Sequence, residues 1–166
     1  MTVRVLALAA AVSAAVIPSL AGAWPPEAVP LEPSAIEVVD GDTIRVSGSY
    51  TLLSGEALGH DRVRLLEIDA PEIFSPRCRA ELERGQAAAA RVRGLVQSAV
   101  DAEIVLSGQR DRNRRPLGRL LLDGTDVALT LMREGLAIPW RPGRAAWEAR
   151  GRHWCPVWHP SSTDTP

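Results

Sequence analysis

Carboxylates and arginines are the side chains of this 166-residue chain that could carry chemistry. There are 20 Asp and Glu residues against 19 basic residues, and every basic residue is an arginine. The absence of lysine excludes a phosphate-loop lysine, a lysine Schiff base and a Ser-Lys dyad. Two cysteines cannot build a four-thiolate zinc site, and three histidines leave little material for a Ser-His-Asp triad. What remains is cation binding by carboxylates and anion binding by guanidinium groups.

The two kinds of charge are concentrated in different parts of the chain. Residues 24–72 contain ten acidic residues and three arginines, a net charge of −7. Residues 110–152 contain ten arginines and five acidic residues, a net charge of +5. The overall net charge of −1 argues against an indiscriminate nucleic-acid binder. Charge runs are usually solvated faces, yet this separation also suits a site that holds a cation beside an anion.

Three short segments combine these residue types at strand ends and turns. Residues 38–44 place Asp-Gly-Asp-Thr between two β-branched runs, which alone predicts an ordinary hairpin turn. Residues 63–72 read Val-Arg-Leu-Leu-Glu-Ile-Asp-Ala-Pro-Glu, so that an arginine interrupts an apolar strand and two carboxylates follow its end. Residues 111–119 form a dense basic turn that enters another strand. No one of these segments is specific by itself.

Taken together, the segments resemble the staphylococcal nuclease-like, or thermonuclease, family over roughly residues 38–137. The most specific parts are the D-G-D-T turn, the R-L-L-x-I-D-x-P-E segment and a D-R-x-x-R-x-L run. That run leads to Leu-Asp-Gly and then to a helix that closes on Arg-Glu-Gly-Leu-Ala. The resemblance implies a calcium-dependent endonuclease that hydrolyses phosphodiester bonds in DNA and RNA and leaves 3′-phosphates.

Carried over by position, the resemblance assigns three kinds of role. The Ca²⁺ ligands would be the carboxylates of Asp42 and Asp69 and the carbonyl oxygen of Ala70. The carboxylate that orients or deprotonates water would be that of Glu72, and the phosphate-gripping groups would be Arg64 and Arg115. These assignments are chemically sound, because Ca²⁺ prefers oxygen ligands and a guanidinium can donate two hydrogen bonds to a phosphoryl group.

Several of these assignments have competing interpretations. Arg64 could simply pair with Glu67 or Asp61. Arg115 could be a solvated turn residue, and Arg114 is the alternative if the alignment slips by one position, because Asn113 and Arg114 stand where the family has an aromatic residue and a glycine.

The aromatic positions also depart from the family. The family's tyrosines after the Gly-Leu-Ala segment are absent, which leaves Trp140 as the aromatic residue there that could stack on a base. Trp147, Trp154 and Trp158 are further tryptophans, which could equally be core or tail-packing residues.

The periodicity of the chain predicts the elements that must position these residues. The fold class expected is mainly β with helices (α+β), a five-stranded OB-type barrel with one long and two short α-helices. The expected strands are Ile36–Val39, Thr43–Val46, Tyr50–Leu53, Arg62–Ile68, Glu103–Leu106 and Leu117–Leu122. The runs between residues 36 and 68 are expected to form a meander of three antiparallel strands. The expected helices are Cys78–Val100, Asp126–Glu134 and Arg144–Arg150.

The segments outside this domain predict export. Residues 1–23 resemble a signal peptide, with an apolar run of 13 residues and an Ala-Gly-Ala cleavage site, and that run is shorter than the roughly 20 residues of a membrane span. We expect a flexible lead over 24–34, a nuclease-like OB-barrel domain over 35–158 and a disordered tail over 159–166. The mature protein would be periplasmic or extracellular, without a membrane span.

The two cysteines are interpreted in the light of the expected export. In an oxidising compartment Cys78 and Cys155 are expected to form a disulfide, with a metal cluster of His153, Cys155 and His159 as the competing interpretation.

The sequence therefore favours an exported, calcium-dependent nuclease whose partners are DNA and RNA, with single strands preferred, and no obligate protein partner is evident. Two alternatives remain open. A non-catalytic nucleic-acid-binding barrel would account for the changes at the tyrosine positions. A phosphodiesterase acting on small phosphate esters would need no stacking aromatic residues.

Overall fold

The computed structural model describes residues 27–51, 57–58 and 61–157. The predicted signal peptide (1–23) and tail (159–166) lie outside the described residues. In chain order the elements are β1 (Glu27–Leu31), the 3₁₀ helix η1 (Pro33–Ala35), β2 (Ile36–Val38), β3 (Thr43–Val46), β4 (Tyr50–Thr51), β5 (Ala57–Leu58), β6 (Arg62–Leu65), β7 (Ile68–Asp69), α1 (Arg79–Ser98), β8 (Ala102–Arg110), β9 (Pro116–Leu122), β10 (Thr125–Asp126), α2 (Val127–Arg133), β11 (Ile138–Pro139) and α3 (Arg144–Trp154).

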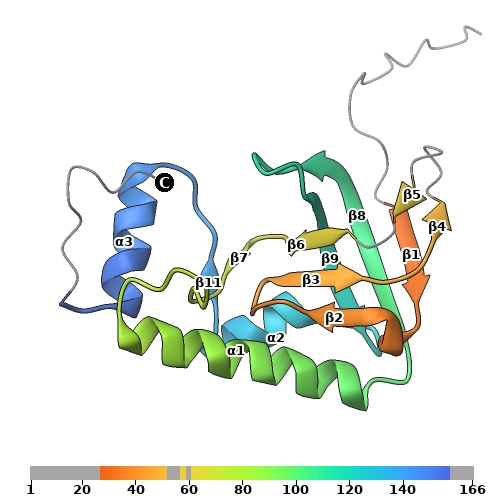
Figure 1. The fold of residues 1–166 in the computed structure, drawn as a ribbon, viewed down its shortest axis with the longest axis horizontal. Helices are drawn as coiled ribbons and strands as arrows, with labels where there is room; N and C mark the ends of the chain where they lie inside the picture. Colours follow the sequence, from red (N-terminus) through yellow and green to blue (C-terminus); the bar gives the residue numbers. More distant parts are fainter. Residues whose placement is uncertain (1–26, 52–56, 59–60, 158–166) are drawn as a thin grey trace, which may run out of the picture.

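Most of the strands form one sheet, in which the order is β1-β8-β9-β6-β3-β2, with β10 paired to β9. The predicted meander is present as β2, β3 and β6, whose pairings are antiparallel, and β6 then pairs in parallel with β9. Two smaller pairs, β4 with β5 and β11 with β7, lie beside this sheet. Helix α1 runs along one side of the sheet, and α3 stands at the end that carries β7 and β11 (Figure 1).

Alternating side chains of the strands build the core. In β9 every second residue is buried, and the first five residues of β8 alternate in the same way, as expected for strands with one face turned inward. The centre of the core consists of side chains with no exposed surface, namely Ile44, Val63, Val92, Ile104, Leu120 and Leu131. Val92 of α1 and Leu131 of α2 are among them, so both helices pack against the strands.

Helices α1 and α2 begin after residues whose side chains cap them. Cys78 precedes α1 and its sulfur accepts a hydrogen bond from the Glu81 amide, while Asp126 precedes α2 and accepts one from the Ala128 amide at 2.8 Å. Gly85 weakens α1 as an isolated helix, yet it is needed there. A Cβ at this position would lie 2.6 Å from the Pro71 carbonyl oxygen, so glycine lets α1 approach the loop that follows β7.

The predicted fold class is confirmed: the protein has an α+β fold with one long and two shorter helices. The expected barrel, however, is not closed by hydrogen bonds among the described strands, because β1 and β2 remain the two ends of the order. Since β1 and β2 are consecutive, one stretch of chain supplies both ends of the sheet.

The prediction of a flexible lead over 24–34 is wrong for the described part of that segment. β1 pairs with β8 over five residues, with Glu27 opposite Leu106 and Leu31 opposite Ala102. Val29 and Leu31 turn inward and are buried, so the low apolar content of this segment is sufficient for an edge strand. None of the described helices has the length and apolar character that crossing a bilayer requires.

A candidate active site of carboxylates and arginines

The turn between β2 and β3 brings the first carboxylates into a narrow space. Gly41 lies against Ala70 and Ala88 of α1, and a Cβ added at Gly41 would come within 2.7 Å of the Ala70 Cβ. Asp40 accepts a hydrogen bond from the amide of Asp42 at 3.0 Å, which closes the turn. Glycine is therefore required between the two aspartates because the turn packs directly on the segment that carries Ala70.

Asp42 is almost fully buried, with 3% of its surface exposed, and both of its carboxylate oxygens accept hydrogen bonds. Its Oδ1 accepts from an Arg64 Nη1 donor and from the Thr43 hydroxyl, and its Oδ2 accepts from the Ala70 amide at 2.6 Å. Thr43 lies opposite Arg64 in the pairing of β3 with β6, so these two side chains share a face of the sheet. The register thus fixes how the first and second predicted segments meet.

Arg64 joins the two predicted ligand carboxylates. Besides Asp42, its Nη2 contacts Asp69 Oδ1 at 3.3 Å and the Ile68 carbonyl at 3.3 Å. Burial lowers the pKa of Arg64, an effect opposed by the charge of Asp69. The alternative that Arg64 pairs with Glu67 is wrong, because Glu67 has φ of +66° in the turn before β7 and pairs with Arg119 instead.

Asp69 is held by two arginines from different parts of the chain. Its Oδ1 contacts Arg64, and its Oδ2 forms an ion pair with Nε of Arg150 in α3 at 3.0 Å. Burial raises the pKa of Asp69, and the charges of Arg150, Arg64 and Arg77 oppose that rise. The side chains of Asp42 and Asp69 therefore face one guanidinium, and a second cation lies on the far oxygen of Asp69.

Arg115 reaches the same cluster from the hairpin that joins β8 to β9. Asp111 organises this loop by accepting from the amides of Asn113 and Arg115 at 2.9 Å and from Arg115 Nε at 2.7 Å. From there Arg115 Nη1 donates to the Thr43 hydroxyl at 3.4 Å. Arg114 has φ of +63° and an exposed side chain, so the loop directs Arg115 and not Arg114 toward Thr43.

Glu72 lies in the loop after β7 and is exposed. Its Oε1 accepts hydrogen bonds from the amides of Ile73 and Phe74, each at 2.9 Å. This side chain therefore shapes its own loop, three residues after Asp69. The described structure gives it no ion pair with Arg64 or Arg115.

Trp140 is at the same end of the molecule. Ile138 pairs with Asp69 in the register of β11 with β7, and the Trp140 amide donates to the Glu67 carbonyl at 2.8 Å. The Trp140 side chain is 46% exposed, so its ring is available to a ligand. Trp154, in contrast, is 1% exposed and belongs to the interior.

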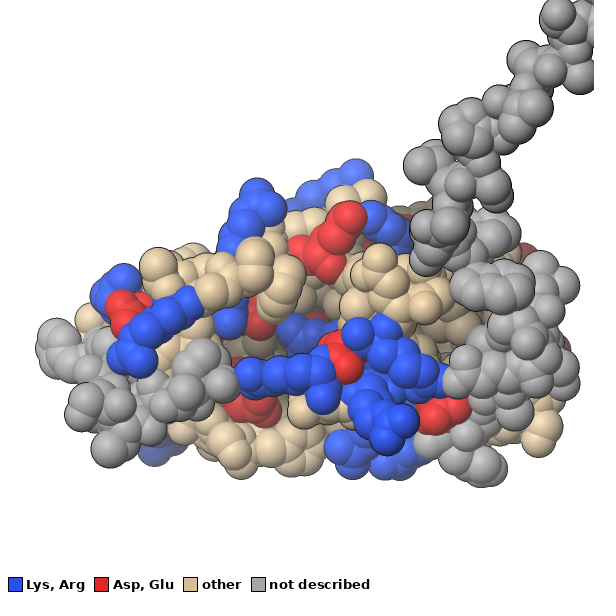
Figure 2. All heavy atoms as spheres, turned by 90° about the horizontal axis from the view of Figure 1, so that it is seen from above, with Lys and Arg blue, Asp and Glu red and all other residues tan. Residues whose placement is uncertain are grey.

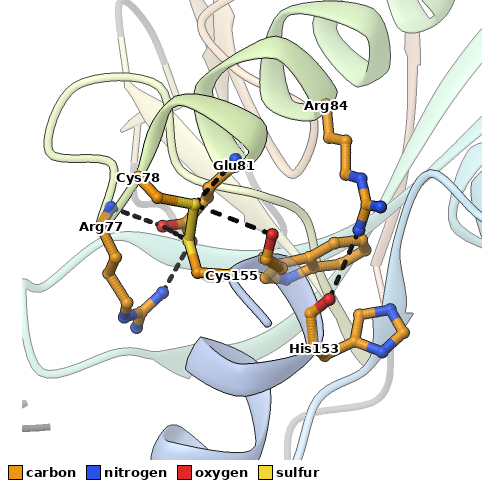
Figure 3. Close-up of a disulfide and its surroundings, with 7 residues drawn as sticks. Arg77, Cys78, Glu81, Arg84, His153 and Cys155 are labelled. Carbon is orange, nitrogen blue, oxygen red and sulfur yellow. Dashed lines mark hydrogen bonds and ion pairs between the residues drawn. A yellow bond between two sulfur atoms is a disulfide. The ribbon is translucent and has the colours of Figure 1, made fainter. Parts of the chain in front are cut away.

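The predicted disulfide is present and lies beside this cluster. Cys78 and Cys155 are bonded, which joins the start of α1 to the end of α3 across 77 residues of sequence (Figure 3). The buried Glu81 carboxylate accepts from the Arg77 amide and from its guanidinium next to this bond. The competing cluster of His153, Cys155 and His159 is excluded, because the Cys155 sulfur is bonded to Cys78.

The distribution of charge over one face of the molecule is mixed. Arginine and carboxylate side chains lie side by side around a hollow in this face (Figure 2). Asp40 adds a further carboxylate. Burial raises the pKa of Asp40, and its contact with Thr43 and the charges of Arg64 and Arg115 oppose that rise without cancelling it. The −7 and +5 parts of the sequence therefore meet at one site.

The donor chemistry of this site fits Ca²⁺ in part. Asp42 and Asp69 offer hard carboxylate oxygens on opposite sides of one guanidinium, which is the ligand type that Ca²⁺ prefers. Within the described residues, however, no group of three or more His, Cys, Asp or Glu side chains has the spacing of a metal site. A calcium ion there would need backbone, water and phosphate oxygens to complete its shell.

Sequence reasoning missed two residues of this cluster. Asp40 and Arg150 were given no role, although each contacts a predicted site residue. The repeated aspartate of the D-G-D turn was an available signal for Asp40. No local pattern points to Arg150, because α3 reaches Asp69 only in the folded chain.

Comparison with known proteins agrees with the sequence resemblance. A family model described as staphylococcal nuclease homologue matches residues 62–148. The chain is 36% identical over 100 residues to the SPbeta prophage-derived endonuclease YokF of Bacillus subtilis (strain 168), covering 60% of this chain and 31% of that protein. It is 35% identical over 100 residues to endonuclease YncB of the same strain, covering 60% and 43%. The chain thus spans less than half the length of either relative.

Proposed function

Because the chain belongs to the family of staphylococcal nuclease homologues, we propose that it is a nuclease that hydrolyses phosphodiester bonds in DNA and RNA. The observation that carries this proposal is the position of Arg64 between Asp42 and Asp69, with Arg115 reaching Thr43 beside them. Cation-binding and phosphate-binding groups are thereby adjacent, as phosphodiester hydrolysis requires.

The two arginines would bind the scissile phosphate. A guanidinium presents several donors in a fixed plane and can hold two phosphate oxygens at once. Arg64 is partly buried and oriented by two carboxylates, while Arg115 is oriented by Asp111. Both groups are therefore held in place before substrate arrives, so little reorganisation accompanies the growth of negative charge on the phosphoryl oxygens.

Glu72 would accept the proton of the attacking water. Its carboxylate is exposed in the loop after β7, where among the described residues the Ile73 and Phe74 amides engage one of its oxygens. The second oxygen is thus available to a water molecule. A carboxylate positioned in this way typically contributes about 10²–10⁴-fold to the rate as a general base.

Asp42, Asp69 and the carbonyl of Ala70 would hold Ca²⁺. When bound, the ion supplies Lewis-acid polarisation of a phosphate oxygen. Arg64 contacts both aspartates and Arg150 contacts Asp69 as well, so positive charge beside these carboxylates opposes the rise that burial causes in the pKa of Asp69.

The substrate would be a single or frayed strand. Trp140 is an exposed aromatic side chain next to Glu67 and close in register to Asp69, where it could stack on an unpaired base. Stacking of this kind needs a base that is free of its partner strand. The products are expected to carry 3′-phosphates.

Export is part of the same proposal. The apolar run and Ala-Gly-Ala site of residues 1–23 support secretion with cleavage after Ala23, and the Cys78–Cys155 bond suits an oxidising compartment. Amino-terminal sequencing of the protein recovered outside the cytoplasm should begin at Trp24. Recovery of an uncleaved chain in the cytoplasm would contradict this assignment.

A direct assay tests the activity. The purified protein should degrade single-stranded DNA and RNA when Ca²⁺ is present, stop when a chelator is added, and resume when Ca²⁺ is restored. End-labelling of the fragments should show 3′-phosphates.

The other two functions predict different results in this assay. A binding protein without turnover would retard single-stranded DNA in a gel and leave it intact at any calcium concentration. A phosphodiesterase for small esters would hydrolyse bis(p-nitrophenyl) phosphate but not DNA.

A further inference from the structure

The side chain of Arg150 is at least as buried as those of Arg64 and Arg115, the two arginines that the family resemblance identifies. Its side chain is 14% exposed, compared with 19% for Arg64 and 28% for Arg115. Its Nε forms an ion pair with Asp69 Oδ2 at 3.0 Å, and its Nη1 donates to the Arg141 carbonyl at 2.8 Å. The Nη2 group has no hydrogen bond to the described residues and remains available as a donor.

Helix α3 is fastened to the start of α1 on both sides of Arg150. Toward the beginning of α3, the Arg77 guanidinium lies over the Trp147 ring, 5.2 Å from its centroid. Toward the end, Trp154 is buried and Cys155 is bonded to Cys78.

A second contact between the two helices lies near the disulfide. Arg84 of α1 donates to the carbonyl of His153 at 3.4 Å, as the close-up of the disulfide shows (Figure 3). The position of Arg150 on Asp69 is therefore set by contacts that include a covalent bond.

We propose that Arg150 is a third guanidinium of the active site, which binds a phosphate of the substrate strand, and that the Cys78–Cys155 disulfide keeps it there. The inference rests on the proposed nuclease function. Before substrate binds, Arg150 forms an ion pair with Asp69. Once Asp69 serves a metal ion, the Arg150 guanidinium is free to donate to an anion in the same place. Both Arg150 and Cys155 lie beyond the residues 62–148 that match the family model.

This role has a signature that a merely structural role lacks. A cation 3.0 Å from Asp69 repels a metal ion at that carboxylate and attracts a phosphate. Removal of Arg150 should therefore strengthen calcium binding and weaken substrate binding. If Arg150 only held α3 in place, its loss would loosen Asp69 and weaken both.

The test compares Arg150→Ala and Arg150→Lys with the parent protein. Isothermal titration with CaCl₂ alone should give a Kd for Arg150→Ala lower by about threefold or more, since a nearby positive charge is gone. On single-stranded DNA its KM should rise by about tenfold, as expected for the loss of a charge-assisted hydrogen bond, and kcat should change less. Arg150→Lys should keep the parent's calcium affinity and show an intermediate KM, because lysine retains the charge without the planar fork.

Arg152→Ala is the matched control. This arginine lies in the same helix, its side chain is 54% exposed, and its contact is with Glu148 at 3.9 Å. Its removal should change neither the calcium Kd nor the KM by more than about twofold, because an exposed pair of this kind contributes little.

The role of the disulfide is tested with the Cys78→Ser, Cys155→Ser double variant. It should show the same opposite shifts as Arg150→Ala, and adding Arg150→Ala to it should change little more, because both act through one contact. The proposal is overturned if Arg150→Ala weakens calcium and substrate binding together, or changes neither in a parent that cleaves DNA. A parent that cleaves no nucleic acid would instead refute the nuclease function itself.

Discussion

Arg64, Asp42 and Asp69 show how a single side chain can be structural and chemical at once. Arg64 pairs with one buried and one half-buried carboxylate that would otherwise repel each other, and the same guanidinium is the group expected to bind phosphate. A change at Arg64 would therefore disturb both tasks. Glu72 and Arg115 allow cleaner tests, because their contacts are confined to one loop each and, for Arg115, to the Thr43 hydroxyl.

Glu72→Gln removes a base while keeping a hydrogen-bond acceptor. The glutamine carbonyl can still accept from the amides of Ile73 and Phe74, so the loop should retain its shape. We expect kcat on single-stranded DNA to fall by about 10²-fold or more, with KM within about threefold of the parent. Glu83→Gln, an exposed change on α1, serves as the control and should leave kcat unaltered. Equal activity of Glu72→Gln and the parent would remove Glu72 from the mechanism.

Arg115→Ala and Arg114→Ala form a matched pair of adjacent substitutions. Arg115 contacts Asp111 and Thr43, whereas the Arg114 side chain is exposed. We expect kcat/KM to fall by about 10²-fold or more for Arg115→Ala, the usual effect of removing one transition-state donor. Arg114→Ala should lose less than about threefold, because an exposed guanidinium adds mainly to general attraction for the strand. The reverse order of the two losses would assign the phosphate contact to Arg114.

At the scale of elements, the β8–β9 hairpin is held by one carboxylate. Burial raises the pKa of Asp111, but hydrogen bonds from the Arg115 amide and guanidinium and from the Asn113 amide outweigh it and leave the pKa lowered from 3.8. Because the folded-state pKa is the lower one, the stabilisation from Asp111 is complete above pH 3.8 and is lost as the pH falls through that lowered value.

The hairpin should therefore keep its order at pH 5 and lose it on strong acidification. The amides of Asn113 and Arg115 donate hydrogen bonds to Asp111, so their NMR signals would report the change with pH. Asp111→Asn should show the disordered hairpin already at neutral pH, with a raised KM. An Asp111→Asn hairpin indistinguishable from the parent's at neutral pH would rule out this anchoring role.

The disulfide is the second feature at this scale, because it joins two helices across 77 residues. Closing a loop of that length restricts the unfolded chain, and its loss typically costs about 2–5 kcal/mol of unfolding free energy. Reduction should lower the urea midpoint of the protein accordingly. The Cys78→Ser, Cys155→Ser double variant has no bond to reduce, so its midpoint should not respond to the reductant; identical midpoints of the parent with and without reductant would contradict the prediction.

At the scale of the whole molecule, the site collects charges from the β2–β3 turn, β6, β7, the β8–β9 hairpin and α3. A ligand that binds only this assembled arrangement must stabilise the fold. Calcium at about 100 times its Kd should add about 2.7 kcal/mol to the free energy of unfolding, which differential scanning calorimetry would detect as a higher Tm. Asp42→Asn should abolish the increase. A Tm that is the same in calcium and in chelator would argue against a calcium site.

The sequence by itself determined the chemistry and much of the local structure. The residue types limited the site to carboxylates and guanidinium groups, and helix α1 and strand β3 lie within one or two residues of their predicted bounds. These features are local, since periodicity and capping residues act within a few positions of the chain. The motif resemblance assigned roles to Asp42, Asp69 and Arg64, although nothing local specifies that Arg64 contacts both aspartates.

Only the tertiary structure decided which side chains meet. It turned Arg115 toward Thr43 in preference to Arg114, showed that residues 27–31 pair with β8, and brought Arg150 onto Asp69. Each of these outcomes depends on strand register, on a turn with positive φ or on a bond between distant residues. Such long-range pairings leave no periodic trace in the sequence, because their energy arises between segments that are neighbours only after folding.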